Sequence, residues 1–541
     1  MARVLEMRAA LVLFALGLAC GHEAPASTAA PEIDRSSGER PAGVVLELSF
    51  DGGDAALAAL VAQLPSGSFR AGVPTRVSVL LDGMIEIPSE IGDHVDGHSP
   101  IRLVMARVDG ELRSAVAVRL DAPLDAHPGG GPRGTDRVGD HAAVDDRIAV
   151  VSDDASLLEA AFPYLAYGAL ARPSAPGAVV LHVPSRTLAT TVRTAMEQTV
   201  QEQQARAMES IRLARVEQGR PPELGDPEPL VRSIADALLA RVAYLPDLDE
   251  ATVRLEPTSS GLALTMEADV ASGSPLAAAL AAYERIPPSL VASMPTESFV
   301  ALATGTRGDA RATTGDAIVD VLAGVAGSRM SAEERARLDA VADEVTAIRG
   351  DQTAVAFGVH EDRGTFVAIA TRDGSDAAFP QPWGRSFPWT STLLRVLFRC
   401  DPGARAQGTA LCGEPGAEVG HAAYFVPHGM RADVISGEPT AIATPIVVHG
   451  SAPAASPDLA RDLAALPAST FGALVVRPLR MLPVMSLFGG PGAGLPRGDG
   501  AFVLALAYDE GQLTIALRAS RATMTDLDTL QHLFANGSDS E

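Results

Sequence analysis

Two imidazoles and two carboxylates lie within six consecutive residues of this 541-residue chain, in the segment Asp93-His94-Val95-Asp96-Gly97-His98. Imidazole nitrogens and carboxylate oxygens are ligands for zinc and for other divalent ions. The spacing matches no established motif such as His-Glu-x-x-His, and a loop is a poor cage for a metal. A metal site at His94, Asp96 and His98, which would serve a metal-dependent hydrolase, therefore competes with a solvated acidic loop, and we favour the loop.

Large aromatic side chains gather in one later segment, which also holds both tryptophans. It contains Phe379, Trp383, Phe387 and Trp389, whereas aromatic residues make up only 4% of the whole sequence. Rigid aromatic side chains are common in pockets and at the centres of interfaces. The segment is therefore a candidate binding site for a protein partner or an apolar ligand. The alternative is that these side chains fill a core beneath a long loop.

Lysine is absent, so all 43 basic residues are arginines. A P-loop needs a lysine near the phosphates, Schiff-base enzymes need a lysine amine, and Ser-x-x-Lys acyltransferases need a lysine beside the serine. These three classes are excluded, and no Gly-x-Ser-x-Gly motif is present. We expect no cofactor and favour a binding protein over an enzyme, although a catalytic site built from distant residues stays open.

The N-terminal leader has the order of an export signal. Arg3 and Arg8 precede an apolar run at residues 9–18, and Ala19 precedes Cys20. The run is too short to span a bilayer comfortably as a retained helix. The leader resembles that of bacterial lipoproteins, in which the cysteine after the cleavage site is diacylated and becomes the N-terminus. The alternative is plain secretion after cleavage by an ordinary peptidase.

The resemblance implies a signal peptide at residues 1–19, a lipid on Cys20 and a place in the cell envelope. In some lipoproteins an Asp directly after the cysteine retains the protein in the inner membrane. This chain has Gly21 at that position, which favours the outer membrane. In an exported chain the remaining thiols are expected to oxidise, so Cys400 and Cys412 are predicted to form a disulfide. Closing so short a loop contributes roughly 3 kcal/mol by the loop-entropy estimate.

The formal net charge is −24. Nucleic-acid binding depends on basic side chains that neutralise phosphates, so this charge argues against a nucleic-acid partner. It also disfavours anionic lipid surfaces, which leaves the N-terminal lipid as the expected route to a membrane.

A short pattern occurs three times, at residues 64–69, 294–299 and 466–471. Each copy reads Leu or Met, then Pro, two variable residues, Ser or Thr, and Phe. Such a proline ends a helix, and the following residues enter a strand. The pattern predicts a diverged repeat and two related halves. The chain is loosely similar to uncharacterised secreted bacterial proteins whose repeated units open with a Leu-Pro-x-x step.

Alternating apolar residues around turn signals predict antiparallel hairpins. The expected strand pairs are 101–107 with 112–120, 252–255 with 262–270, 353–359 with 365–371, and 502–508 with 513–520. Apolar residues at helical spacing predict helices at 188–216, 230–245 and 331–349. We therefore expect the α+β class, with antiparallel sheets built from hairpins and packed helix pairs.

The expected organisation is a signal peptide at residues 1–19, a tether at 20–43, and two α+β domains at 44–290 and 291–541. The expected function is a non-catalytic envelope lipoprotein that binds a protein partner or an apolar ligand. A metal-dependent envelope hydrolase and a structural envelope protein are the alternatives.

Overall fold

The computed structural model divides into two compact units that are interleaved along the chain. Unit 1 comprises residues 1–188, 249–268 and 527–541, and unit 2 comprises residues 189–248 and 269–526. The two predicted domains meet near residue 290, which lies within unit 2. The structure describes residues 38–64, 70, 73–83, 85, 87–124, 131–132, 135–139, 141–172, 178–218, 228–292, 294, 296–307, 332, 336, 352–360, 364–371, 420–426, 456–482 and 498–537.

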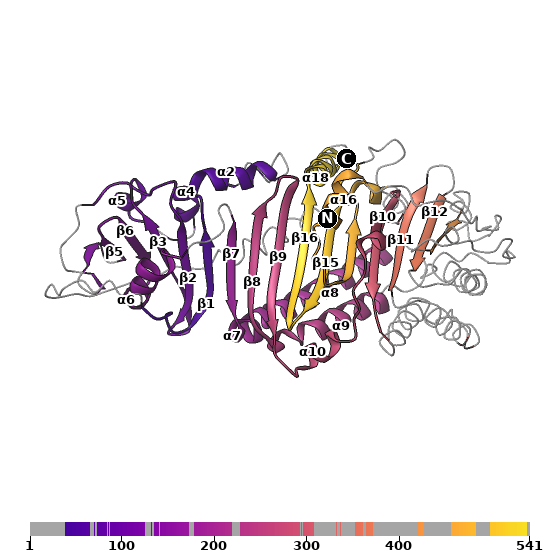
Figure 1. Ribbon diagram of the computed structural model, residues 1–541, viewed down its shortest axis with the longest axis horizontal. Coiled ribbons are helices and arrows are strands. Elements are labelled where there is room, and N and C mark those ends of the chain that lie inside the picture. Colours follow the sequence, from indigo (N-terminus) through magenta and orange to yellow (C-terminus); the bar gives the residue numbers. More distant parts are fainter. Residues whose placement is uncertain are drawn as a thin grey trace. The chain divides into compact units, whose positions relative to one another are not determined.

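The sheet of unit 1 is antiparallel, in the strand order β9-β8-β7-β1-β2-β3-β6-β5-β4 (Figure 1). Its strands are β1 (Val44–Phe50), β2 (Ile101–Val108), β3 (Glu111–Arg119), β4 (Asp136–Val138), β5 (Ala142–Asp145), β6 (Ile148–Ser152), β7 (Val179–Pro184), β8 (Leu248–Pro257) and β9 (Gly261–Val270). Its helices are α2 (Gly53–Gln63), α4 (Val77–Asp82), α5 (Ser89–Gly92), α6 (Ala155–Pro163), the π-helical η3 (Tyr164–Ala169) and α7 (Ser185–Thr187).

Helices cover both faces of strands β2 and β3 in unit 1. Leu103 and Val116 pack on one face with residues of α2, α4 and α5. Val104 and Ala115 pack on the other face with residues of α6 and η3. Because both faces are buried, these strands are almost continuously apolar rather than alternating with polar residues.

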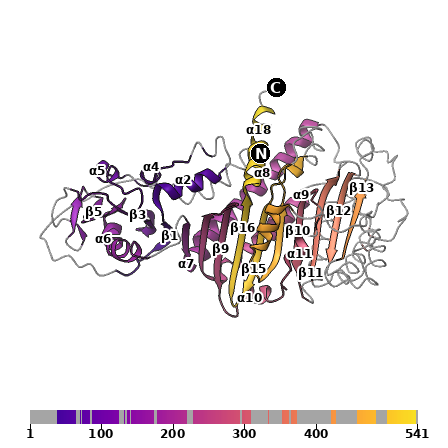
Figure 2. The same ribbon diagram turned by 45° about the horizontal axis from the view of Figure 1, so that its top comes forward.

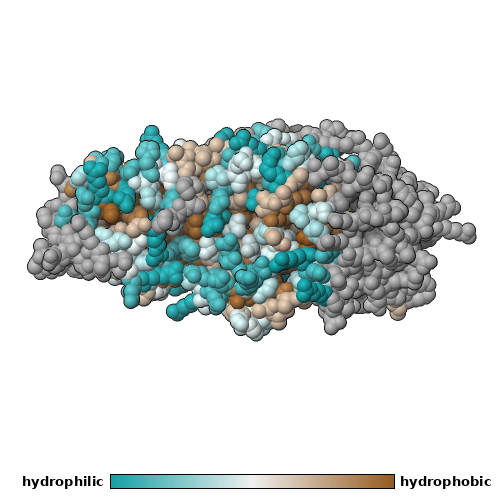
Figure 3. All heavy atoms as spheres, viewed as in Figure 1, coloured by the Kyte–Doolittle hydropathy of each residue, from teal (hydrophilic) through white to brown (hydrophobic). Residues whose placement is uncertain are grey.

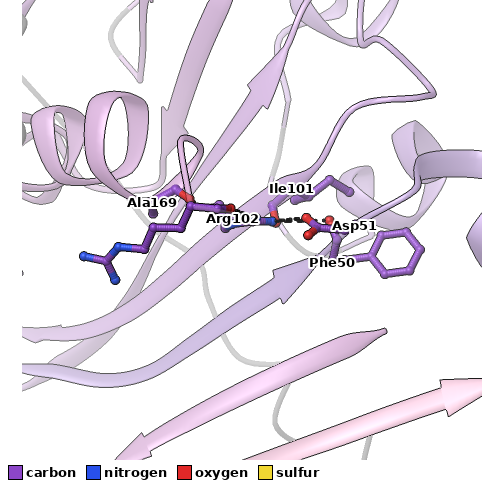
Figure 4. Close-up of polar contacts among 6 residues, drawn as sticks. Phe50, Asp51, Ile101, Arg102 and Ala169 are labelled. Atoms are coloured by element: carbon purple, nitrogen blue, oxygen red, sulfur yellow. Dashed lines mark hydrogen bonds and ion pairs between the residues drawn. The ribbon is translucent and has the colours of Figure 1, made fainter. Parts of the chain in front are cut away.

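The buried guanidinium of Arg102 joins the ends of several elements of unit 1 (Figure 4). Its Nη1 donates to the Asp51 carboxylate at 2.5 Å and to the Ile101 carbonyl at 2.9 Å. Nε donates to the Ala169 carbonyl at 3.1 Å, and Nη2 donates to the Arg172 carbonyl at 3.0 Å. A buried charge is tolerated where it has such partners, so Arg102 fixes the end of η3 against β1 and β2.

The sheet of unit 2 is also antiparallel, in the order β13-β12-β11-β10-β14-β15-β16. Its strands are β10 (Ser298–Gly305), β11 (Gln352–His360), β12 (Gly364–Thr371), β13 (Gly420–Val426), β14 (Thr470–Val476), β15 (Phe502–Asp509) and β16 (Gln512–Ser520). The unit also contains η4 (Leu188–Val192) except its first residue, α8 (Arg193–Gln218), α9 (Glu228–Val242), η5 (Leu245–Asp247), α10 (Pro275–Leu280), α11 (Pro288–Ala292), α16 (Pro457–Ala464), η7 (Leu479–Met481) and the start of α18 (Arg521–Gly537).

The core of unit 2 lies between the sheet and the short helices α11 and α16. Leu290 and Val291 of α11 and Leu463 of α16 pack against Ala303 and Ala473 of the sheet. Small alanine side chains let helices approach a sheet closely. In Figures 1 and 2 the α8–α9 hairpin, which is the predicted long helix and its partner, lies across the strands of unit 2.

The predicted helix–proline–strand step is confirmed in the second and third copies of the repeated pattern. There α11 leads to β10, and α16 leads to β14. In the third copy, the Thr470 hydroxyl donates to the Pro467 carbonyl at 2.6 Å. The first copy follows α2, and the next described helices and strand after it are α4, α5 and then β2.

The predicted α+β class and the antiparallel hairpins are confirmed. The turn between β2 and β3 has positive φ angles at Asp109 (51°) and Gly110 (90°), as a tight Asp-Gly hairpin requires. The long helix predicted from residue 188 begins with the π-helical η4 before it becomes α8. The third predicted helix, at 331–349, lies almost entirely outside the described residues. None of the helices within the described ranges has the length and hydropathy needed to cross a bilayer.

Candidate binding face on the sheet of unit 2

The central strands of unit 2 present alanines and valines on one face and mostly larger side chains on the other. Successive side chains of a strand point to opposite faces. Ala301, Ala303 and Ala473 are at most 2% exposed and belong to the core beneath α11 and α16. The residues that alternate with them are leucines, valines and phenylalanines, which point away from these helices.

Four leucines form a continuous row across this second face. Leu302 of β10 lies opposite Leu474 of β14, Leu474 lies opposite Leu504 of β15, and Leu504 lies opposite Leu517 of β16. Directly opposed residues on antiparallel strands have neighbouring side chains. The row therefore makes an uninterrupted apolar band, four strands wide.

A second band runs parallel to the leucines, two residues away from them on β10, β14 and β15, and it extends onto β11. Phe357 of β11 lies opposite Val300, which lies opposite Val476, and Val476 lies opposite Phe502. We call the combined surface the leucine face. Its residues are Val300, Leu302, Phe357, Leu474, Val476, Phe502, Leu504 and Leu517.

The leucine face is incompletely covered by the rest of the protein. Leu302 is 49% exposed and Phe357 is 41% exposed, and the other members are half-buried. In unit 2, Met196, Leu213 and Leu238 of the α8–α9 hairpin are also exposed. Contiguous exposed apolar surface is uncommon on soluble proteins and usually marks a contact with another molecule.

The described surface on one side of the molecule is drawn in Figure 3. On the side of the molecule drawn in Figure 3, the described surface is largely hydrophilic, with smaller hydrophobic areas between the polar ones. This agrees with the net charge of −24.

A buried arginine fixes the strand ends beside the leucine face. Arg477, which follows Val476, donates from Nη1 to the Ser298 carbonyl at 2.9 Å and to the Ser298 hydroxyl at 2.6 Å. Its backbone N–H donates to the Phe299 carbonyl at 2.8 Å. Burial lowers the pKa of Arg477 to about 10, so the side chain remains charged at neutral pH. These bonds hold β10 and β14 in register and thereby align Leu302 with Leu474.

The segment with the predicted metal ligands is ordered by contacts of another kind. His94 Nδ1 lies 3.0 Å from the Asp121 carboxylate, and both side chains are exposed. Asp96 instead accepts bonds from the Ser99 hydroxyl at 2.5 Å and from the His98 backbone N–H at 3.0 Å, and these bonds lower its pKa. Throughout the described part of the chain, no group of three or more His, Cys, Asp or Glu side chains is placed to hold a metal ion.

This segment is also attached to the start of α2. The Asp54 backbone N–H donates to the Gly97 carbonyl at 2.7 Å, and the Asp54 carboxylate accepts from the Val77 backbone N–H at 2.7 Å. Gly53 has a φ of 56° and lies so close to Gly97 that a Cβ atom would be 1.9 Å from its carbonyl oxygen. The segment thus has a structural role in joining α2 to the strands.

The other predicted site residues lie outside the described residues. These are Cys20, Phe379, Trp383, Phe387, Trp389, Cys400 and Cys412. The lipid, the aromatic binding segment and the disulfide therefore stay predictions.

Sequence reasoning missed the leucine face, although a signal for it was present. The strands 298–305, 470–476 and 502–509 alternate alanine with leucine or valine, so they are apolar on both faces. That pattern predicts a sheet covered on both sides. It does not show that one of the two faces is only partly covered.

No protein-family model matches this chain, no curated protein matches it, and no solved structure matches it.

Proposed function

We propose that this protein is a non-catalytic binding protein of the cell envelope and that its leucine face takes an apolar ligand. The observation that carries the proposal is the row Leu302–Leu474–Leu504–Leu517, whose first member is 49% exposed. The row lies on paired strands, so the backbone N–H and C=O groups beneath it are already bonded within the sheet. Its side chains have no polar atoms, and the face therefore offers a ligand apolar contact alone.

An acyl chain is the ligand class that suits such a surface. It is long, flexible and without hydrogen-bonding groups, and a flat apolar band demands no polar partner from it. Fully burying a wholly exposed leucine side chain contributes about 1.5–3 kcal/mol, and Leu302, which is 49% exposed, would contribute about half of that. Several such contacts along the band would support micromolar affinity after the cost of association is subtracted.

We also propose that the chain is exported and anchored through a lipid on Cys20, as the leader indicates. A tethered protein with an apolar binding face would hold a lipid or another apolar molecule beside the membrane. Among the described residues, only the leucine face supports this proposal.

We further propose that the two halves of the chain are related. In unit 1 the series β1-β2-β3 and β7-β8-β9 extend in opposite directions from the neighbouring strands β1 and β7. In unit 2 the series β10-β11-β12 and β14-β15-β16 extend in the same manner from β10 and β14. This recurrence of strand order supports duplication of a unit made of one strand and one hairpin.

The ligand proposal is tested by titrating the purified full chain with a pyrene-labelled fatty acid and then displacing it with the unlabelled acid. We expect saturable binding, and we expect Leu302→Glu to weaken it at least tenfold, because a charged side chain would have to be desolvated beneath the ligand.

Val79→Glu is the matched control, since Val79 is 56% exposed and lies on α4 in unit 1. Equal binding by the wild type and by Leu302→Glu would remove the leucine face as the site. Absence of saturable binding by the wild type would overturn the proposed ligand class, and a protein partner would then be sought on the same face.

A further inference from the structure

A second feature of unit 2 lies beyond α10, where the chain approaches the ends of two strands. Tyr283 forms a bridge with Thr306, and the Glu284 backbone N–H donates to the Gly305 carbonyl at 3.1 Å. A Cβ atom at Gly305 would lie 2.0 Å from the Glu284 carbonyl oxygen, so only glycine permits this approach. On the other side, the Ile286 backbone N–H donates to the Thr470 carbonyl at 2.8 Å. The segment is thus attached to both β10 and β14.

Residues of this segment and of the ends of β10, β14 and β15 line an open cavity of about 240 Å³. The cavity is equivalent in volume to about eight water molecules at liquid density, which suits a molecule with a single ring. Three aromatic residues line it, namely Tyr283, Phe471 and Tyr508. The rings of Tyr283 and Phe471 are stacked, with centroids 4.5 Å apart and an interplanar angle of 28°.

Two arginines also line the cavity. Arg285 forms an exposed ion pair with Asp509 at 3.2 Å. Arg307 is exposed and held by its backbone N–H, which donates to the Ala282 carbonyl at 2.8 Å. Within the described part of the chain, no carboxylate lies at ion-pair distance from the Arg307 guanidinium, and Glu284 in the same lining does not pair with it.

We propose that this cavity binds a small aromatic carboxylate. The planar ring of the ligand would lie against the aromatic wall of Tyr283, Phe471 and Tyr508, and its carboxylate would reach the Arg307 guanidinium. Arginine binds carboxylates through two parallel N–H donors, and such charge-assisted bonds are stronger than neutral ones. The cavity shares no lining residue with the leucine face, and its polar and charged lining requires a different ligand.

Calorimetric titration of the full chain with benzoate tests this proposal. Cyclohexanecarboxylate has the charge without the aromatic ring, and benzyl alcohol has the ring without the charge. We expect saturable binding of benzoate, at least threefold weaker binding of cyclohexanecarboxylate, and at least tenfold weaker binding of benzyl alcohol.

Arg307→Gln is expected to weaken benzoate binding at least tenfold without affecting the fold, because the side chain is exposed. The matched control is Arg212→Gln on α8, another exposed arginine of unit 2, and it should bind benzoate as the wild type does. Leu302→Glu should also bind benzoate normally, which separates this site from the leucine face. Lack of saturable benzoate binding, or equal binding by Arg307→Gln and Arg212→Gln, would overturn the proposal.

Discussion

Leu302 lies directly opposite Leu474, and each is the third residue after the phenylalanine that ends a copy of the repeated pattern. The two copies therefore meet at equivalent positions on neighbouring antiparallel strands, which gives the pair β10–β14 a local two-fold relationship. One consequence is that α11 and α16, which precede the two strands, pack on the same face of the sheet. The leucines on the opposite face receive no cover from either helix.

The buried hydrogen bonds of Arg102 predict a large loss of stability when its guanidinium is removed. Arg102→Met keeps an apolar stem but leaves the Asp51 carboxylate and the Ala169 and Arg172 carbonyls without their donor. We expect the free energy of unfolding of unit 1 to fall by about 3–5 kcal/mol, the usual cost of breaking a buried ion pair. Urea denaturation followed by circular dichroism measures this loss.

Arg107→Met is the control for that experiment. Arg107 belongs to the same strand, is exposed, and donates from Nη1 to the Gly110 carbonyl. Its replacement should change stability by less than about 0.5 kcal/mol, as is usual for surface substitutions. Equal losses in the two variants would show that Arg102 does not hold these elements together.

The close approach of Gly53 to Gly97 predicts that α2 cannot accept a side chain at its start. In Gly53→Ala the new methyl group would meet the Gly97 carbonyl, and φ would remain in the left-handed region. We expect a loss of about 2–4 kcal/mol, together with faster hydrogen exchange at the Asp54 amide, whose bond to Gly97 would lengthen.

Gly110→Ala separates the two causes of that loss. Gly110 also has positive φ, but a Cβ atom there would meet nothing within 4 Å. The free energy of unfolding of Gly110→Ala should fall only by the cost of holding alanine at positive φ, about 1–2 kcal/mol. If Gly53→Ala were no more harmful than Gly110→Ala, the contact with Gly97 would not matter for stability.

The buried carboxyl of Asp462 predicts a specific dependence of stability on pH. Burial in α16 raises its pKa, and the charge of Arg518 opposes that rise only in part. Folding then favours the protonated form, so the free energy of unfolding falls as the pH rises from the ordinary aspartate pKa through the raised value. Asp462→Asn should remove this fall.

Between about pH 3 and about pH 7, the urea midpoint of Asp462→Asn should therefore rise relative to that of the wild type as the pH increases. Asp269→Asn, at an exposed position in β9, should follow the wild type over the same range. A constant difference between Asp462→Asn and the wild type at every pH would contradict the raised pKa.

The leader predicts a lipid on Cys20, and intact mass tests this directly. Protein produced in a bacterial host with its own leader should have the mass of residues 20–541 plus the lipid on Cys20. Cys20→Ala should lose that addition. An unmodified wild-type mass would instead indicate a freely secreted protein, and its ligands would be sought in solution.

Local features of the sequence determined the four predicted hairpins and the helices α8 and α9. Asp109-Gly110 predicts its hairpin because the turn needs positive φ at both positions, and the 2-residue alternation of strands depends only on neighbouring residues. The absence of lysine and the net charge of −24 likewise follow from composition and exclude several classes of protein.

The tertiary structure decided which strands pair and which faces are covered. Leu302 and Leu474 are 172 residues apart, and no local pattern specifies that they meet. The same holds for His94, whose partner is Asp121 rather than the neighbouring Asp96. Alternation of alanine and leucine shows that both faces of a strand are apolar, but burial of a face depends on helices contributed by distant parts of the chain. Because α11 and α16 both cover the alanine side, the leucine side depends for its cover on other elements.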